Sequence, residues 1–132
     1  MDIKLKLKEL LNNSRSDYFH FSVSAAIVTK DNRIFYGVNV ETSSPAAGIC
    51  AERNALYNAI TNGVRESDIK EVHVMSKNGV FPCFICRQAL SDYCSSDVKV
   101  YAHSINDDVK SATIEELCTY AFGRSDLWNQ DL

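Results

Sequence analysis

The sequence lacks the features that identify membrane-spanning, secreted and multidomain proteins. No apolar run is long enough to cross a bilayer, and lysines interrupt the apolar residues of the N-terminal segment, which is untypical of a secretory signal. No internal repeat, low-complexity tract or linker rich in proline, serine and glycine divides the chain. We therefore expect no membrane partner and a single domain over residues 1–132.

The chain also lacks a basic excess. It contains 14 lysine and arginine residues against 17 acidic residues, which gives a formal net charge of −3. Domains that bind nucleic acid through its phosphates usually carry a basic excess, so we expect no nucleic-acid partner. The hydrophobic content of 45% and the charged content of 23% are typical of a soluble globular protein.

The cysteine content does not indicate a disulfide framework either. The chain has five cysteines, an odd number, and no recognisable export signal. Disulfides are rare in reducing compartments, so the expected location is the cytoplasm.

Apolar periodicity predicts helices and strands in an alternating order. The predicted helices are 3–11, 50–61, 83–93 and one that begins at Thr113, and the predicted strands are 21–29, 33–40, 71–75 and 98–102. The segment 41–48 is long for a loop inside a compact domain, which suggests a functional connection. This order of elements indicates an α/β fold with a central sheet.

Two short motifs carry the most specific chemical signal. The first is Cys-Ala-Glu at 50–52, and the second is Pro-Cys-Phe-Ile-Cys at 82–86. Both are predicted at helix N-termini, where unpaired N–H groups favour the thiolate. The three thiolates of Cys50, Cys83 and Cys86 would leave one position of tetrahedral zinc open for water, and Glu52 is placed to carry its protons. This arrangement is typical of a zinc-dependent hydrolytic deaminase that acts on a nucleobase.

A zinc ion with three thiolates carries a net negative charge, which would weaken the acidification of bound water. Arg53 directly follows Glu52 in the sequence. We expect Arg53 to hydrogen-bond one or more thiolates and to restore the Lewis acidity of the metal.

Two other uses of the cysteines are possible. A structural zinc site would need His73 or His103 as a fourth ligand, but neither histidine has a close partner in sequence, and the alternation around His73 predicts the solvent face of a strand. A redox pair of Cys83 and Cys86 would leave Glu52 and the third cysteine unexplained. The remaining thiols, expected in core or half-buried positions, are Cys94 and Cys118.

Several segments in the right order resemble the cytidine deaminase family, of the small homotetrameric type with three cysteine ligands. The resemblance runs from about Tyr18 to Leu127. It implies a three-layer α-β-α fold with a mixed central sheet of about five strands, one Zn²⁺ per subunit, a homotetramer, and hydrolytic deamination of cytidine or deoxycytidine. The segments that carry it are 20–23 (HFSV), 37–41 (GVNVE), 48–53 (GICAER), 82–88 (PCFICRQ) and 122–123 (FG).

The resemblance also implies roles for individual residues. Those roles are ribose binding by Asn39 and Glu41, stacking of Phe21 on the pyrimidine, a hydrogen bond from the backbone N–H of Ala51 to the base carbonyl, proton transfer by Glu52, and entry of Phe122 into the pocket of a neighbouring subunit.

The chain departs from the family pattern near the predicted metal site and in the loop after Glu41. Bulky residues replace small ones at Phe81, Phe84 and Ile85, where they are expected to reshape the pocket; the other departures are Ser22, Ser24, Thr42 and Pro45. These changes keep open the deamination of another aminopyrimidine nucleoside, such as a blasticidin-type antibiotic. An editor of RNA or single-stranded DNA is opposed by the acidic balance. A non-catalytic zinc-binding assembly protein is opposed by the presence of Glu52.

Overall fold

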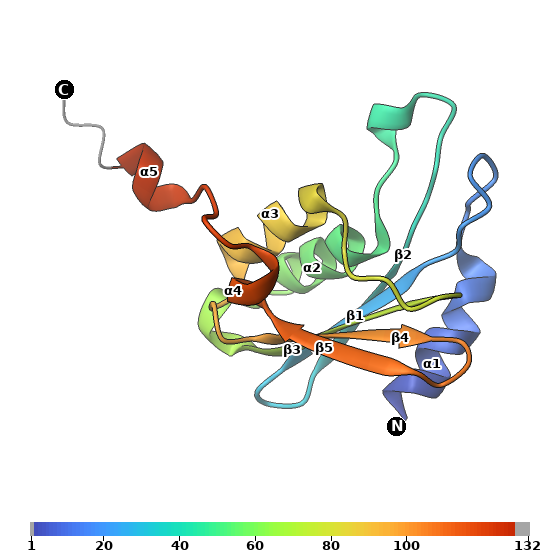
Figure 1. Ribbon diagram of the computed structural model, residues 1–132, viewed down its shortest axis with the longest axis horizontal. Helices are drawn as coiled ribbons and strands as arrows, with labels where there is room; N and C mark the ends of the chain where they lie inside the picture. The colour runs from blue at the N-terminus through green and yellow to red at the C-terminus, as the bar shows by residue number, and fades with distance from the viewer. Residues whose placement is uncertain (1, 129–132) are drawn as a thin grey trace.

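A mixed five-stranded sheet forms the centre of the computed structural model, which describes residues 2–128. The strands lie in the order β2-β1-β3-β4-β5 (Figure 1). Only β3 and β4 are parallel; the other neighbours are antiparallel. The strands are β1 (Ser24–Thr29), β2 (Ile34–Val38), β3 (Ile69–Ser76), β4 (Lys99–Ser104) and β5 (Val109–Thr113).

Helices cover both faces of this sheet. The helix α1 (Ile3–Leu10) packs on one face through Leu7, which contacts Ala26 and Met75. The helices α2 (Ala51–Thr61) and α3 (Phe84–Tyr93) pack on the opposite face, where they build the larger of the two apolar clusters. The predicted three-layer α-β-α architecture with a mixed sheet is therefore confirmed. The short elements are η1 (Leu11–Asn13), η2 (Pro45–Ala47), η3 (Glu66–Asp68), α4 (Ile114–Leu117) and α5 (Arg124–Trp128).

Close packing between β2 and α2 fixes the position of the predicted catalytic helix. A Cβ atom at Gly37 would lie 2.4 Å from the backbone nitrogen of Ala55, which is closer than side-chain atoms approach. Only glycine therefore allows β2 to contact the backbone of α2 at this point. Because β1 pairs with β2, the N-terminus of α2 is held at a defined place above the sheet.

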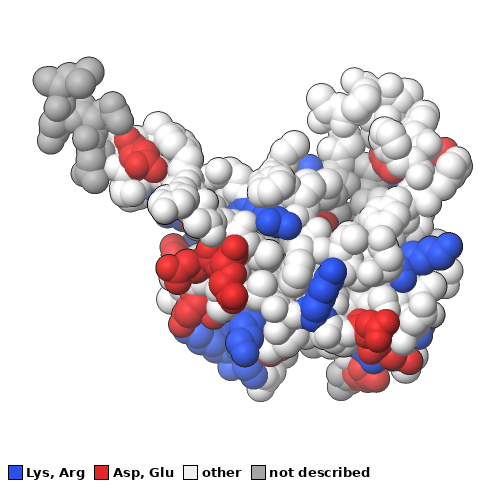
Figure 2. All heavy atoms as spheres, in the orientation of Figure 1, with Lys and Arg blue, Asp and Glu red and all other residues white. Residues whose placement is uncertain are grey.

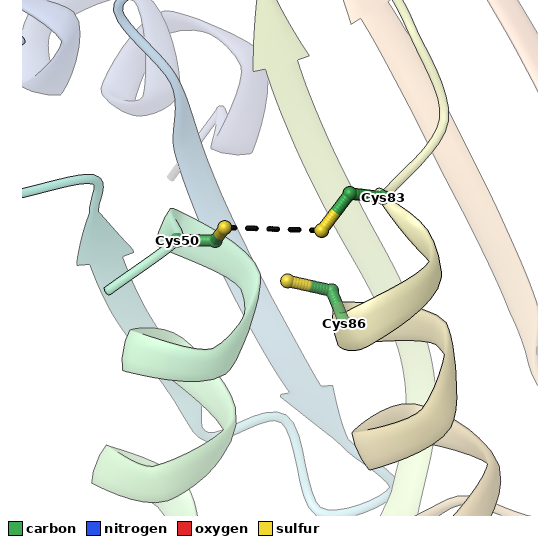
Figure 3. A group of neighbouring side chains, drawn as sticks. All are labelled: Cys50, Cys83 and Cys86. Atoms are coloured by element: carbon green, nitrogen blue, oxygen red, sulfur yellow. Dashed lines mark hydrogen bonds between the residues drawn. The ribbon is translucent and has the colours of Figure 1, made fainter. Parts of the chain in front are cut away.

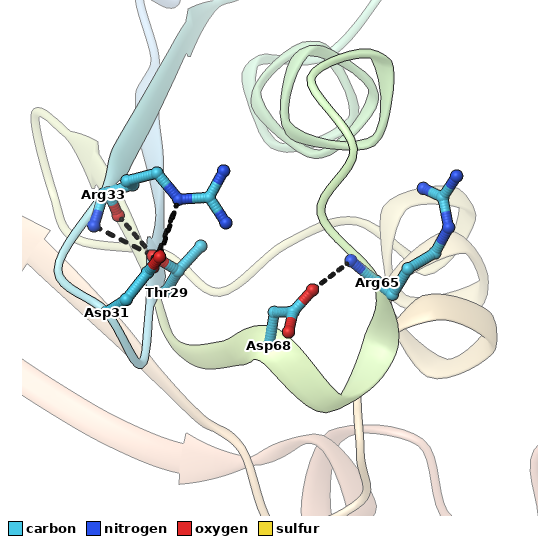
Figure 4. A network of polar contacts seen from close by, with 5 residues as sticks. All are labelled: Thr29, Asp31, Arg33, Arg65 and Asp68. Atoms are coloured by element: carbon cyan, nitrogen blue, oxygen red, sulfur yellow. Dashed lines mark hydrogen bonds and ion pairs between the residues drawn. The ribbon is translucent and has the colours of Figure 1, made fainter.

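Polar contacts hold the turns at the end of the sheet away from the cysteines (Figure 4). In the hairpin between β1 and β2, the backbone N–H of Arg33 donates to the Thr29 hydroxyl at 2.9 Å, and the Arg33 guanidinium pairs with Asp31. Before β3, the backbone N–H of Arg65 donates to the carboxylate of Asp68 at 2.8 Å. Both turns are closed by side chains of neighbouring residues, as is usual for short connections.

Most predicted elements are present, and two were missed. The strand β5 has a largely exposed sequence at the sheet edge, so it carries no alternating pattern. The five-residue α5 lies away from the body of the sheet (Figure 1) and has no buried residue. Within residues 2–128, no helix is both long and apolar enough to cross a membrane.

The expectation for His73 is wrong. Its side chain is buried, with 7% exposure, in the middle of β3. It stacks on Tyr101 and His103 with ring centroids 4.8 and 5.2 Å apart, and its Nδ1 lies 2.9 Å from Nε2 of His103. The α1 layer covers this side of the strand, so the alternation in the sequence does not mark a solvent face.

Candidate active site

The three predicted cysteine ligands meet between the first turns of α2 and α3 (Figure 3). Their sulfur atoms all lie within 4.8 Å of one another, and those of Cys50 and Cys83 are 3.9 Å apart. Cys86 is buried, Cys50 is half-buried and Cys83 is exposed. The cluster therefore has a solvent-accessible side and a protein side.

The local fold explains this convergence. Cys50 is the residue that caps the N-terminus of α2, and Cys83 occupies the same position at α3. No side chain caps either helix start, so the first N–H groups face the sulfur cluster with their partial positive charge. Cys86 follows one turn later on the face that it shares with Cys83.

The donor set fits a zinc ion. Zinc binds thiolates at about 2.3 Å, which places two sulfurs of a tetrahedral site about 3.8 Å apart. The separation of 3.9 Å between Cys50 and Cys83 matches this value. Among the described residues, this is the one group of three or more cysteine, histidine or acidic side chains that is close enough to hold a metal.

The thiols differ in their acidity. Hydrogen bonding with Cys86 lowers the pKa of Cys50 to about 5 against the opposing effect of burial, and Arg53 and Cys83 lower it further. The same hydrogen bond, together with burial, raises the pKa of Cys86. Cys50 is therefore the thiol of this pair that is more readily deprotonated, and a bound cation would favour the thiolate form of Cys86 as well.

The side chain of Arg53 lies beside this cluster, as expected. Its Nη2 atom lies 3.6 Å from the sulfur of Cys50. Although burial opposes it, hydrogen bonds to Cys50 and Cys86 raise the pKa of Arg53, so its charge is permanent. Its Nε is buried and has no hydrogen-bond partner among the described residues.

Glu52 is buried in the first turn of α2, with 6% exposure. Burial raises its pKa to about 7, and the nearby Cys50 thiolate adds to this rise. A carboxyl group with this pKa exchanges protons readily at neutral pH, which is the property that general acid–base catalysis requires.

A cavity of about 350 Å³ opens beside Cys50 and Arg53. The loop 41–48, which the sequence marks as a possible functional connection, forms one of its walls. The surface is hollowed between this loop and helix α3, and acidic and basic side chains are interspersed on the same face (Figure 2). The sequence-predicted residues Asn39 and Glu41 line the cavity, and so do Tyr18 and Phe19, which the sequence analysis missed.

Glu41 and Asn39 hold the segment that contributes these aromatic residues. One carboxylate oxygen of Glu41 accepts hydrogen bonds from the backbone N–H groups of Tyr18 and Phe19 at 2.8 and 3.0 Å. The amide oxygen of Asn39 accepts from the N–H of Val23 at 2.9 Å, and its nitrogen donates to the carbonyl of Phe21 at 2.8 Å. Both side chains therefore shape the pocket wall, a role that the sequence analysis did not anticipate.

The structure places the other predicted substrate residues in different ways. Ala51 is the buried first residue of α2, next to the cysteine cluster. Phe21 is 37% exposed and does not line the cavity. Phe122 is exposed on the segment after α4, and neither does it line the cavity of its own chain.

The bulky residues near the ligands do not narrow this cavity. Phe84 and Ile85 are 78% and 67% exposed and line a separate surface depression with Tyr57. Phe81 packs against the larger apolar cluster. Within one chain, the expectation that they reshape the pocket therefore finds no support. The two remaining cysteines have the burial expected of them, with Cys94 buried and Cys118 half-buried.

The fold and the site together define an α/β metalloprotein with a three-thiol centre. The chain belongs to the family described as the cytidine and deoxycytidylate deaminase zinc-binding region, whose model matches residues 3–102. The metal for which the three cysteines are arranged is accordingly zinc.

Individual relatives agree with this assignment. The chain is 34% identical over 130 residues to a cytidine deaminase of Halalkalibacterium halodurans, covering 96% of this chain and 98% of the relative. It is 32% identical to a blasticidin-S deaminase of Bacillus cereus, with 78% of each chain covered. A crystal structure of cytidine deaminase from Burkholderia pseudomallei, 29% identical, superimposes with a TM-score of 0.86 over 92% of this chain and 100% of the other.

Proposed function

We propose that this protein is a zinc-dependent hydrolase that deaminates cytidine and deoxycytidine to uridine and deoxyuridine, with release of ammonia. The observation that carries the proposal is the buried Glu52, with its pKa near 7, beside a three-thiol centre at the edge of a cavity. Family membership and relatives named as cytidine deaminases support the same activity.

In this proposal Cys50, Cys83 and Cys86 hold one zinc ion per subunit. A zinc ion held there would supply the acidification of a water molecule, which attacks the carbon that bears the amine. Glu52 accepts a proton from the attacking water and delivers it to the adjacent ring nitrogen. The same carboxylate then passes the second proton of the water to the departing amine, so that one water is consumed and one ammonia leaves.

Other side chains orient the nucleoside. Ala51 offers the free N–H of the first helical turn to the base carbonyl. Glu41 and Asn39 border the cavity where the ribose hydroxyls would lie. Arg53 offsets the negative charge of the thiolates.

We propose that an aromatic residue of a second chain completes the pocket that Tyr18 and Phe19 line in each chain. Phe122 is exposed and lies outside the cavity of its own subunit, which is consistent with insertion into a neighbouring pocket. Phe21 would stack on the pyrimidine once that pocket is complete. We propose a homotetramer on this basis, acting as a single-domain enzyme of pyrimidine salvage in the cytoplasm on a free nucleoside, without nucleic-acid or membrane partners.

The experiment is to incubate zinc-loaded protein with cytidine and to follow the loss of its ultraviolet absorbance. We expect turnover by the unmodified protein, and a loss of about 10²- to 10⁴-fold in Glu52→Gln with unchanged zinc content, because only the proton carrier is removed. Near-normal turnover by Glu52→Gln would overturn the assignment of Glu52. The absence of turnover by the zinc-loaded wild type would overturn the proposed substrate.

A second candidate is deamination of a blasticidin-type aminonucleoside. It is favoured by the similarity to a blasticidin-S deaminase. Parallel assays with cytidine and blasticidin S separate the two, because the better substrate has the higher kcat/KM. The presence of Glu52 opposes a non-catalytic zinc-binding role.

A further inference from the structure

The segment 117–124, which we call the C-terminal strap, runs along helix α3 and joins α4 to α5. Its first residues, Leu117 and Cys118, pack against the larger apolar cluster, whereas Tyr120 is fully exposed and Phe122 is 57% exposed. Beyond Cys118 its position therefore depends on contacts with α3.

Two consecutive residues of α3 make three of these contacts. Nη1 of Arg87 donates to the carbonyl of Leu117 at 3.2 Å, and Nε2 of Gln88 donates to the carbonyl of Phe122 at 2.9 Å. The thiol of Cys118 donates back to the carbonyl of Arg87 at 3.4 Å. Residues that directly follow the ligand Cys86 thus hold the strap at Leu117 and Phe122, and its last residue, Arg124, contacts Asp92 and Tyr93 further along α3.

Arg87 also contacts the loop that carries the other ligand. Its Nε donates to the carbonyl of Pro82 at 2.7 Å, the residue before Cys83. Its guanidinium lies 4.5 Å from the ring centroid of Phe84. No carboxylate pairs with Arg87 among residues 2–128. The side chain of Arg87 therefore joins the strap to the segment 82–83, which we call the cysteine loop.

We propose that Arg87 and Gln88 are positioning residues that couple the cysteine loop to the C-terminal strap. When Cys83 is held in place, the carbonyl of Pro82 before it is also fixed. Arg87 bonds this carbonyl and that of Leu117, so that a fixed Pro82 also fixes the start of the strap. Gln88 fixes the carbonyl of Phe122. The part that concerns catalysis rests on the proposed function, since it assumes that Phe122 completes a neighbouring pocket.

Arginine is suited to this role because its rigid planar fork can donate to two carbonyls at once, whereas lysine offers a single flexible ammonium. Coupling between two sites is reciprocal. Zinc at the cysteines should therefore order the strap, and loss of the Arg87 contacts, which join the strap to the residue before Cys83, should weaken the hold on zinc.

The test uses the zinc-loaded protein and its Arg87→Lys and Gln88→Ala variants. Arg65→Lys is the matched control, since Arg65 is exposed and its guanidinium also donates to a carbonyl, that of Val64. Zinc release is timed with a chromophoric chelator, and amide hydrogen exchange of the strap is measured with and without zinc. Neither readout requires substrate.

We expect zinc removal to speed strap exchange by about tenfold in the wild type and in Arg65→Lys. In Arg87→Lys the strap should exchange rapidly with or without zinc, and zinc release should be about tenfold faster. Gln88→Ala, a change at an exposed position that folding tolerates, should speed exchange near Phe122 and leave zinc release within about twofold of wild type.

An unchanged rate of strap exchange on zinc removal in the wild type would overturn the coupling, as would wild-type zinc release by Arg87→Lys. If Arg87→Lys does not fold, the wild-type comparison and Gln88→Ala decide. With cytidine, Gln88→Ala should raise KM by about tenfold and leave kcat within about twofold, because Phe122 would serve binding. A wild type that shows the coupling without turnover would contradict the proposed function alone.

Discussion

The two faces of the sheet each carry a group of titratable side chains, and the two groups differ in access. On the α2 and α3 face, Cys50, Cys83 and Cys86 converge at helix N-termini beside a cavity. On the α1 face, His73 and His103 are hydrogen-bonded to each other within the sheet, and neither lines the cavity beside Cys50. The sulfur atoms of the cysteine group are free to bind a metal beside an accessible space. Most ring nitrogens of the histidine group, in contrast, already form hydrogen bonds within the protein.

The histidine group has a defined direction of hydrogen bonding. The carboxylate of Glu71 accepts from Nε2–H of His73 at 3.1 Å, so that Nδ1 of His73 accepts from Nε2–H of His103. Nδ1 of His103 is then a bare acceptor; it is buried and has no hydrogen-bond partner among residues 2–128. Burial accordingly lowers the pKa of His103 to about 4, and the nearby His73 and Lys4 contribute. The difference between the faces shows that burial of titratable groups indicates function only where a cavity gives access to them.

Removal of a sulfur should have the largest effect. We expect Cys86→Ala to reduce bound zinc from about one per subunit to near zero and to abolish turnover, because two thiols retain the ion poorly. Metal analysis after dialysis checks this. Cys94→Ala, at a buried thiol outside the cluster, should keep its zinc. Full zinc content in Cys86→Ala would contradict the ligand set.

Removal of the neighbouring positive charge should have the next largest effect. Arg53→Gln should lower kcat/KM and zinc affinity by about 10- to 100-fold, because the thiolate of Cys50 loses its hydrogen bond and the centre its compensating charge. Kinetics and chelator competition measure the two quantities. If both stay unchanged, Arg53 has no part in tuning the metal.

Low pH should reveal the contribution of the histidine group to the stability of the fold. The pKa of His103 is about 4 in the folded protein against an ordinary value near 6.5, so the folded state favours the neutral ring. The stabilisation is complete above about pH 6.5 and is lost as the pH falls towards 4, because the unfolded chain binds the proton first. Urea unfolding at several pH values should show this slope, and His103→Gln should flatten it.

The third histidine provides the control for that slope. His20 is exposed and has a positive φ of 56°, which asparagine tolerates. His20→Asn should leave the pH dependence of unfolding unchanged. If His20→Asn flattens the pH dependence of unfolding as much as His103→Gln does, that dependence does not arise from His103.

Small changes at the outer edge of the cysteine cluster should have the smallest effect. Phe84 and Ile85 are exposed and lie outside the cavity. Phe84→Ala and Ile85→Ala should therefore change KM for cytidine by less than about threefold, provided that the oligomer is intact. A large change in KM in an intact oligomer would show that these side chains enter a pocket formed between subunits.

The pair of Cys83 and Cys86 was predictable because its geometry is local, whereas Cys50 meets this pair only through the tertiary arrangement of α2 and α3. The spacing of Cys83 and Cys86 places them on one helix face, and the motifs mark the helix starts that the structure confirms. The substrate pocket was less predictable. Tyr18 and Phe19 are placed by hydrogen bonds to Glu41, more than twenty residues away in sequence, and no local pattern encodes that contact.

The sequence by itself determined the α/β class and the place of Cys83 and Cys86 on one helix face, since helix periodicity and ligand spacing act over short stretches of chain. Tertiary structure decided the rest. It buried His73, because a central strand has two covered faces and the alternation of residues cannot reveal what lies over each. It also raised the pKa of Glu52 to about 7, because desolvation depends on the surroundings that the whole fold supplies.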